Sequence, residues 1–70
     1  MDRLYVESSM IESIGFDESA STLEIEFKGG VVWQYYDFPE YLWYELQQAE
    51  SKGRFFHNKI KDQYPGGRVG

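Results

Sequence analysis

The chain has 70 residues, enough for one small domain, and its lack of cysteine excludes disulfide bonds and thiolate metal sites. Five Phe, six Tyr and two Trp provide the large apolar side chains that so short a chain needs for a core. The formal net charge of −5 excludes a basic surface over the whole molecule, so an anionic partner would have to be bound by a local basic region.

Three segments carry β-strand patterns. Residues 7–16 form the first, and the preceding residues 1–6 are expected either to fray or to lie against the sheet. Residues 22–28 alternate apolar and polar side chains, which is typical of a strand with one buried face. Residues 31–37 combine β-branched and aromatic side chains. Because they follow a glycine pair at 29–30, we predict a β-hairpin with a two-residue turn.

Two helical patterns follow the strands. Pro39 and Glu40 suit the start of the first, because proline loses no hydrogen bond there and a carboxylate is favourable at the positive end of a helix. The apolar residues that recur on one side of this helix are Leu42, Leu46 and Ala49. Ser51 is a candidate N-cap for a second helix over about residues 52–61. Residues 66–70 are expected to form a loose tail.

This order of elements predicts the α+β class, with a three-stranded antiparallel β-meander followed by two α-helices packed on one face. We expect a single domain over residues 1–70, with an ordered part at about 7–65. The residues predicted to form the core are Phe27, Tyr36, Leu42, Leu46, Phe56 and Ile60. The start of the chain lacks the features of a signal peptide, and no apolar run could span a bilayer, so a soluble cytoplasmic protein is expected.

The hairpin register decides which face of the sheet carries Trp33 and Tyr35. A two-residue turn pairs Trp33 with Glu26 and Tyr35 with Glu24, which places both rings on the polar face beside the carboxylates. Exposed aromatic side chains on a sheet stack bases in several RNA-binding domains, but neighbouring carboxylates repel phosphate, and ordinary packing is the favoured interpretation. A shift of one residue would exchange the two faces.

Charge is distributed unevenly along the chain. Residues 1–50 hold two basic and eleven acidic residues, a net −9, whereas residues 51–70 hold five basic residues and one acidic residue, a net +4. Such a division indicates either an anionic partner or an attraction between the two parts of the folded chain.

The second predicted helix is the main candidate for a binding site. Arg54, Asn58 and Lys61 have the spacing of one helical face. Lys52 and Lys59 flank this face, and Phe55 lies near its edge, so phosphates and a stacked base could be bound together. The candidate nucleic-acid-binding residues are therefore Lys52, Arg54, Phe55, Asn58, Lys59 and Lys61. The alternative is an ordinary solvated helix face.

Several short motifs together resemble one known family. They are Ser8-Ser9, Ser13-Ile14-Gly15-Phe16-Asp17, Thr22-Leu23-Glu24-Ile25-Glu26-Phe27, Asp37-Phe38-Pro39, Ser51-Lys52-Gly53-Arg54-Phe55-Phe56, Ile60-Lys61 and Tyr64-Pro65. The chain resembles the KTSC domain, which occurs at the C-terminus of some lysyl-tRNA synthetases and as a stand-alone bacterial protein. The central Tyr-x-Tyr motif of that family falls on Trp33 and Tyr35, with Trp in first place. The resemblance implies no catalytic residue, and it suggests RNA binding from the synthetase context.

We therefore predict a small non-catalytic binding module that binds RNA, either tRNA or a single strand, through a basic second helix. The alternative is a protein-interaction module that uses the Trp33/Tyr35 face or the side of the first helix that carries Tyr41 and Tyr44. No cofactor, metal or membrane contact is expected, and we expect a monomer. His57 is the only histidine, and one histidine on a helix rarely indicates catalysis.

Overall fold

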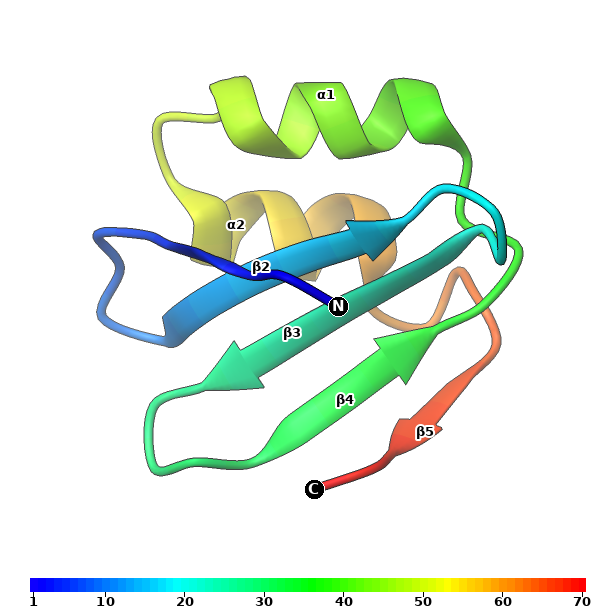
Figure 1. Cartoon of the computed structure of the whole chain (residues 1–70). Helices are drawn as coiled ribbons and strands as arrows, with labels where there is room; N and C mark the ends of the chain where they lie inside the picture. The colour runs from blue at the N-terminus through cyan, green and yellow to red at the C-terminus, as the bar shows by residue number, and fades with distance from the viewer.

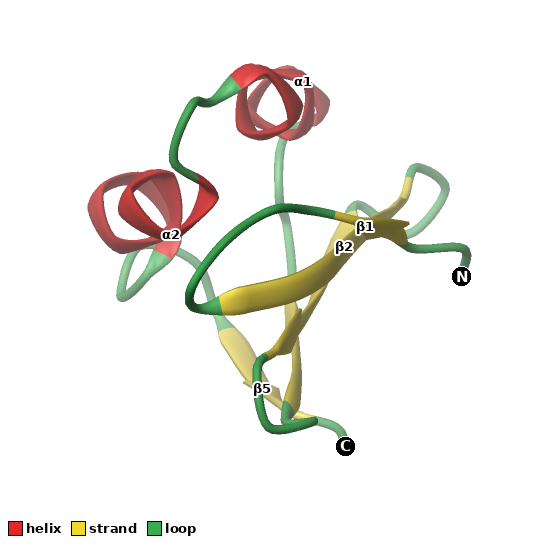
Figure 2. Cartoon of the chain, turned by 90° about the vertical axis from the view of Figure 1, so that its left-hand side faces the viewer, coloured by secondary structure: helices red, strands yellow, loops and turns green.

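The computed structural model describes residues 1–70 as two layers, a five-stranded antiparallel sheet and a helical layer (Figure 1). The elements are β1 (Leu4–Tyr5), β2 (Ile11–Asp17), β3 (Thr22–Phe27), β4 (Val32–Tyr35), α1 (Glu40–Gln48), α2 (Lys52–Phe55), η1 (Phe56–Ile60) and β5 (Gly66–Arg68). The strands lie side by side in chain order. Both helical segments lie on one side of the sheet, and both chain ends lie on the other (Figure 2). No helix of the chain has the length and apolar character needed to cross a bilayer.

The α+β class, the antiparallel sheet and the helices on one face are confirmed, but the prediction of three strands is too low. β1 pairs with β2 at one edge, and β5 pairs with β4 at the other. The expectation of a loose tail over residues 66–70 is therefore wrong. A Cβ atom at Gly66 would lie 2.6 Å from the carbonyl oxygen of Gln34 and 2.7 Å from the ring of Tyr35, so the glycine allows β5 to approach β4 closely.

The β3–β4 hairpin has a three-residue loop rather than the predicted two-residue turn. The N–H of Phe27 donates to the carbonyl of Val31 at 2.8 Å, and the N–H of Gly30 donates to the carbonyl of Phe27 at 3.0 Å. Gly29 and Gly30 both have positive φ, at 98° and 95°, which is inexpensive only for glycine. The ladder is thereby shifted by one residue, so that Ile25 pairs with Trp33.

This shift exchanges the two faces of β4. Trp33 and Tyr35 share the helix-covered face with Ile25 and Leu23, so the prediction that they lie beside the carboxylates is wrong. Tyr36, which was predicted to be in the core, turns to the other face and is 39% exposed.

The core lies between the sheet and the helices. Its ten buried residues are Ile11, Ile14, Leu23, Ile25, Tyr35, Phe38, Leu42, Leu46, Phe56 and Ile60. Burial of the four predicted helical residues is confirmed, and Phe27 is half-buried against the core, where its ring meets that of Phe56 edge to face at 5.2 Å. Phe38 was not predicted. It is fully buried after a turn at Asp37, where φ is 56°, and its ring contacts those of Phe16 and Tyr64.

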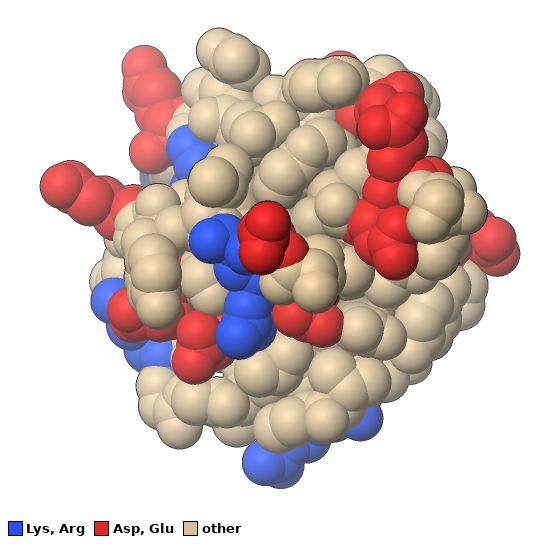
Figure 3. All heavy atoms as spheres, in the orientation of Figure 1, with Lys and Arg blue, Asp and Glu red and all other residues tan.

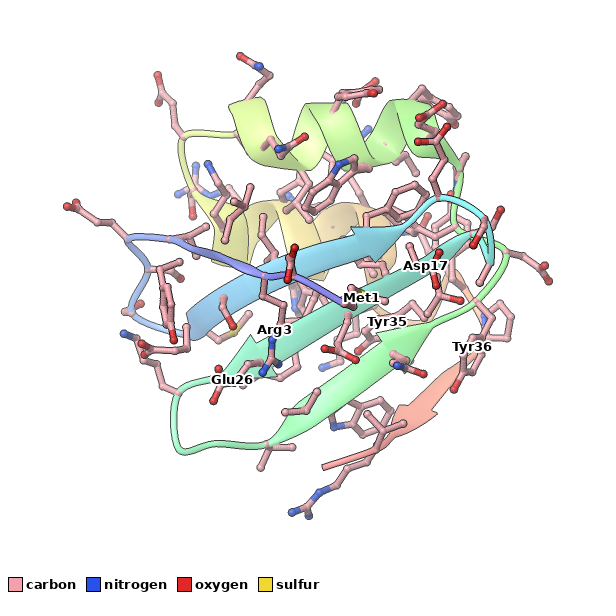
Figure 4. All side chains as sticks on the ribbon, viewed as in Figure 1. Met1, Arg3, Asp17, Glu26, Tyr35 and Tyr36 are labelled. Carbon is pink, nitrogen blue, oxygen red and sulfur yellow. The ribbon has the colours of Figure 1, made fainter.

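The opposite face of the sheet is occupied by an ion network under the N-terminal segment. Arg3 lies 3.5 Å from Glu24 and 3.8 Å from Glu26, and it is seen beside Glu26 in Figure 4. The side-chain amide of Gln34 donates to Glu24 at 2.8 Å, and the Ser13 hydroxyl donates to Glu26 at 3.0 Å. Figure 3, which views the molecule from this side, shows a short basic patch with acidic atoms on either side of it.

Phe56 joins the helical layer to the sheet, so we expect Phe56→Ala to destabilise the domain by about 3–5 kcal/mol. Its ring is 6% exposed and meets Phe27 and Tyr35 edge to face. Urea denaturation followed by circular dichroism would measure the loss, which approaches the whole stability of so small a domain. Tyr41→Ala, at a side chain that is 63% exposed, is the control and should change stability by less than about 0.5 kcal/mol. Equal effects of the two substitutions would contradict this packing.

The pairing of β5 with β4 can be tested with two neighbouring glycines. Gly66→Ala should destabilise the domain by about 1–3 kcal/mol, because the new methyl group would overlap the Gln34 carbonyl and the Tyr35 ring. Gly67→Ala places its methyl group in open space and is the matched control. Thermal melting of both variants would measure the difference. If the two melted together, β5 would not pair with β4 in this register.

Candidate nucleic-acid interface

The basic residues of the C-terminal part form no ion pair. All three ion pairs of the chain lie within residues 1–50: Arg3 binds Glu24 and Glu26, and Lys28 binds Glu12 at 2.9 Å. No ion pair joins the acidic part of the chain to the basic part. The attraction considered between the two parts therefore does not involve a salt bridge. Lys52 and Arg68 donate to backbone carbonyls of the chain, whereas the charged groups of Arg54, Lys59 and Lys61 have neither an ion pair nor a hydrogen bond within it.

The segment that carries most of these charges begins as an α-helix and ends as a wider turn. The Ser51 hydroxyl accepts from the N–H of Arg54 at 3.2 Å, which confirms Ser51 as the N-cap. From Phe56 onward the turn is π-helical, and the N–H of Lys61 donates to the carbonyl of Phe56 at 2.9 Å. This turn contains one residue more than an α-helical turn, so Lys61 is displaced from the face expected from its spacing.

Four of the predicted residues line one shallow hollow of about 510 Å³, which we call the basic groove. Its lining residues are Ala49, Glu50, Ser51, Arg54, Phe55, Asn58 and Lys59. Arg54, Asn58 and Lys59 are exposed, and Phe55 is half-buried. Glu50 contributes the one acidic side chain of the groove. The arrangement offers two cations, an amide and an aromatic edge within one hollow, which are the groups that bind phosphates and bases.

The two remaining predicted residues lie elsewhere. The Lys52 ammonium donates to the carbonyl of Ala49 at 2.5 Å, so it satisfies an unpaired carbonyl just beyond the end of α1. Lys61 lines a second cavity. The structure thus brings together Arg54, Phe55, Asn58 and Lys59, and it separates Lys52 and Lys61 from them.

The second cavity, which we call the aromatic pocket, has a volume of about 310 Å³. Its lining residues are Trp33, Tyr35, Phe56, Lys61, Asp62, Tyr64 and Gly66. The rings of Trp33 and Tyr35 are nearly parallel, with centroids 6.1 Å apart and an angle of 18° between their planes. The sequence did not indicate this pocket, because it forms only when the shifted register of β4 brings both rings to the helix side, where residues 61–64 and β5 close over them.

The ionisation of Tyr35 reflects its place in this pocket. Burial raises the pKa of the Tyr35 hydroxyl, and the negative charge of Asp62 raises it further. Asp62 is held in the left-handed region, with φ of 64°, two residues after the end of η1.

Asp62→Asn should therefore lower the pKa of Tyr35 toward its ordinary value of 10.0 without reaching it, because burial is the larger of the two causes. Asparagine tolerates the left-handed conformation as well as aspartate does. NMR titration of the Tyr35 ring carbon would measure the change. Tyr64, whose pKa is raised by burial and by Tyr41, is the internal control and should titrate unchanged. An unaltered Tyr35 would mean that Asp62 points away from the pocket.

Other candidate chemical groups are accounted for by structural contacts. Glu24 and Glu26 are bound by Arg3, Gln34 and Ser13. His57 is exposed on η1, and no group of three or more His, Cys, Asp or Glu side chains in the chain could hold a metal ion.

These features define a small α+β domain with a basic groove beside an aromatic pocket. The model of the KTSC domain matches residues 7–64, and the chain therefore belongs to the KTSC domain family, which confirms the resemblance seen in its sequence. A crystal structure of a KTSC domain protein from Yersinia pestis superimposes with a TM-score of 0.93 at 40% identity, covering 99% of this chain and 97% of that one.

Relatives include both short and long proteins. A protein from Tsukamurella paurometabola is 39% identical over 59 residues, which are 84% of this chain and 88% of the relative. A lysine–tRNA ligase from Nostoc is 36% identical over 58 residues, which are 83% of this chain but only 10% of the ligase. The fold thus occurs both in proteins of about this length and as one segment of a much longer enzyme.

Proposed function

We propose that this chain is a small RNA-binding module that holds the backbone of a single strand in the basic groove. The observation that carries the proposal is that the cations of residues 51–70 form no ion pair, while the basic residues of the acidic part are all paired. Arg54 and Lys59 are exposed in one groove, where they can bind successive phosphates. Nothing within the folded chain competes with phosphate for them except Glu50, which lines the same groove.

Phe55 and Asn58 could bind the bases of the strand, in addition to the phosphates bound by Arg54 and Lys59. The half-buried Phe55 ring lies in the groove between the two cations in sequence, and it can stack on a base. The Asn58 side chain can donate to and accept from a base edge. These contacts favour a single strand, whose bases are free to stack, over a closed duplex.

The match to part of a lysine–tRNA ligase supports RNA rather than another polyanion. Two phosphate contacts on a domain with a net charge of −5 give only a weak site. Attachment to an enzyme that handles tRNA would raise the effective RNA concentration at such a site without any further contact. A weak site on a small module is therefore sufficient in that setting.

RNA affinity should fall steeply with salt. If Arg54 and Lys59, the two cations of the groove, each neutralise one phosphate, the slope of log affinity against log salt should be about −1.4 for a single strand. Fluorescence anisotropy of a labelled single-stranded RNA, titrated from low to moderate salt, would measure it. A flat salt dependence would contradict phosphate binding, and absence of binding at low salt would contradict RNA binding altogether.

The location of the site can be tested with two substitutions of equal charge. Lys59→Glu should weaken RNA binding by about tenfold or more, because it replaces a charge-assisted contact with repulsion. Lys28→Glu changes the net charge equally, but it lies outside the groove, so it should have a much smaller effect. Equal losses would indicate a response to net charge alone.

Arg54→Glu together with Lys59→Glu should abolish most binding with little change in melting temperature, since both side chains are exposed.

A protein partner is the second candidate, and one observation favours it. Tyr41 and Tyr44 are 63% and 56% exposed on α1, and Tyr44 borders a shallow hollow shared with Phe55. The version of this hypothesis that used Trp33 and Tyr35 on an exposed sheet face is less favoured, because those rings lie on the helix side of the sheet, where Tyr35 is buried and Trp33 is half-buried. If RNA binding fails at low salt, the Tyr41/Tyr44 surface is the remaining interface.

A further inference from the structure

We propose that the aromatic pocket holds one unstacked base of the bound strand, with a preference for guanine. In taking the ligand to be a nucleotide, this inference rests on the RNA-binding function proposed above. The pocket of about 310 Å³ is at the lower end of the size range of ligand pockets, which suits a single base better than a larger ligand.

The walls of the pocket suit a flat aromatic ligand. Four of its seven lining residues are aromatic: Trp33, Tyr35, Phe56 and Tyr64. Tyr35 and Phe56 meet edge to face at 5.7 Å, whereas Trp33 and Tyr35 are almost parallel. The Trp33 ring is half-buried, so part of it remains open to a ligand. Aromatic side chains bind every base through its face, and an indole offers the largest such surface.

Two charged residues of opposite sign, Lys61 and Asp62, line the pocket, so each can bind a different part of a nucleotide. Lys61 is exposed and forms no ion pair, so it can bind the phosphate attached to the base. The Asp62 carboxylate can accept two hydrogen bonds side by side. Among the bases, guanine presents two adjacent donors on one edge, the ring N1–H and the exocyclic amino group, which match a carboxylate. The influence of Asp62 on Tyr35 is consistent with a carboxylate that faces the pocket.

The groove and the pocket are lined by consecutive residues of one helical segment. Phe55 borders the basic groove and Phe56 borders the aromatic pocket, and the wide turn of η1 then directs Lys61 to the pocket. A strand held by Arg54 and Lys59 can therefore extend toward Lys61. The π-helical turn is the feature that divides the cations between the two hollows.

The test uses two free nucleotides that differ by one amino group, guanosine 5′-monophosphate and inosine 5′-monophosphate. Each is titrated into ¹⁵N-labelled protein while the indole N–H resonances are followed by NMR. Guanosine monophosphate should shift the Trp33 resonance saturably and bind about tenfold more tightly than inosine monophosphate, since it makes one more hydrogen bond to a carboxylate. Trp43, which stacks on Phe16 and does not line the pocket, is the internal control and should not shift.

Two variants separate the contributions. Asp62→Asn should remove the difference between the two nucleotides, and Lys61→Gln should weaken both, whereas Lys28→Gln, which lies outside both hollows, should affect neither. An unmoved Trp33 resonance at millimolar nucleotide, or equal affinity for the two nucleotides, would overturn the guanine pocket. If RNA still binds with the salt dependence above while Trp33 stays unmoved, only this inference fails. If guanosine monophosphate binds the pocket but RNA binding does not respond to Lys59→Glu, the groove fails and the pocket stands.

Discussion

The position of Phe56 determines how the helical segment meets the sheet. Its ring lies edge to face against Phe27 of β3 and Tyr35 of β4, so one side chain ties the segment to two adjacent strands. Phe56 is also the residue at which α2 gives way to η1, and its carbonyl accepts the N–H of Lys61. Because this ring is fixed, one side of α2 and η1 lines the basic groove, and the residues after η1 line the aromatic pocket. Both candidate sites thus depend on one buried contact.

A second constraint acts from the sheet. The three-residue loop that ends in Gly29 and Gly30 sets the register of β4, and that register turns Trp33 and Tyr35 toward the helices. The same shift leaves Glu24 and Glu26 on the opposite face, where Arg3 and neighbouring polar groups satisfy them. The aromatic surface and the acidic surface are therefore separated by the thickness of the sheet. Glu24 and Glu26 are thus kept away from the aromatic pocket, and Asp62 is the one carboxylate that lines it.

The sequence determined the elements better than their register. Alternation in residues 22–28, the Ser51 cap and the apolar side of α1 predicted local structure, because each depends on neighbouring residues. The hairpin register depends on whether the loop has two or three residues, and a glycine pair is compatible with both lengths. The three-residue loop reverses the faces on which Trp33 and Tyr36 lie. β5 was missed because Gly66 and Gly67 are typical of a tail, whereas here the missing side chain at Gly66 allows close pairing. The prediction that Arg54, Asn58 and Lys61 share one helical face was wrong for Lys61. It assumed α-helical spacing, whereas residues 56–60 form a π-helical turn.

The way the charges are distributed explains how a net acidic domain can keep a basic site. An exposed ion pair adds little to stability, so leaving Arg54, Lys59 and Lys61 unpaired costs the fold little. The acidic residues next to the core are different, because Glu24 and Glu26 lie half-buried under the N-terminal segment and need a partner there. Arg3, from that segment, meets this need and leaves the later cations free. The unpaired cations are therefore the ones that cost the fold least when they have no partner. Their position around one helical segment agrees with the proposed binding role.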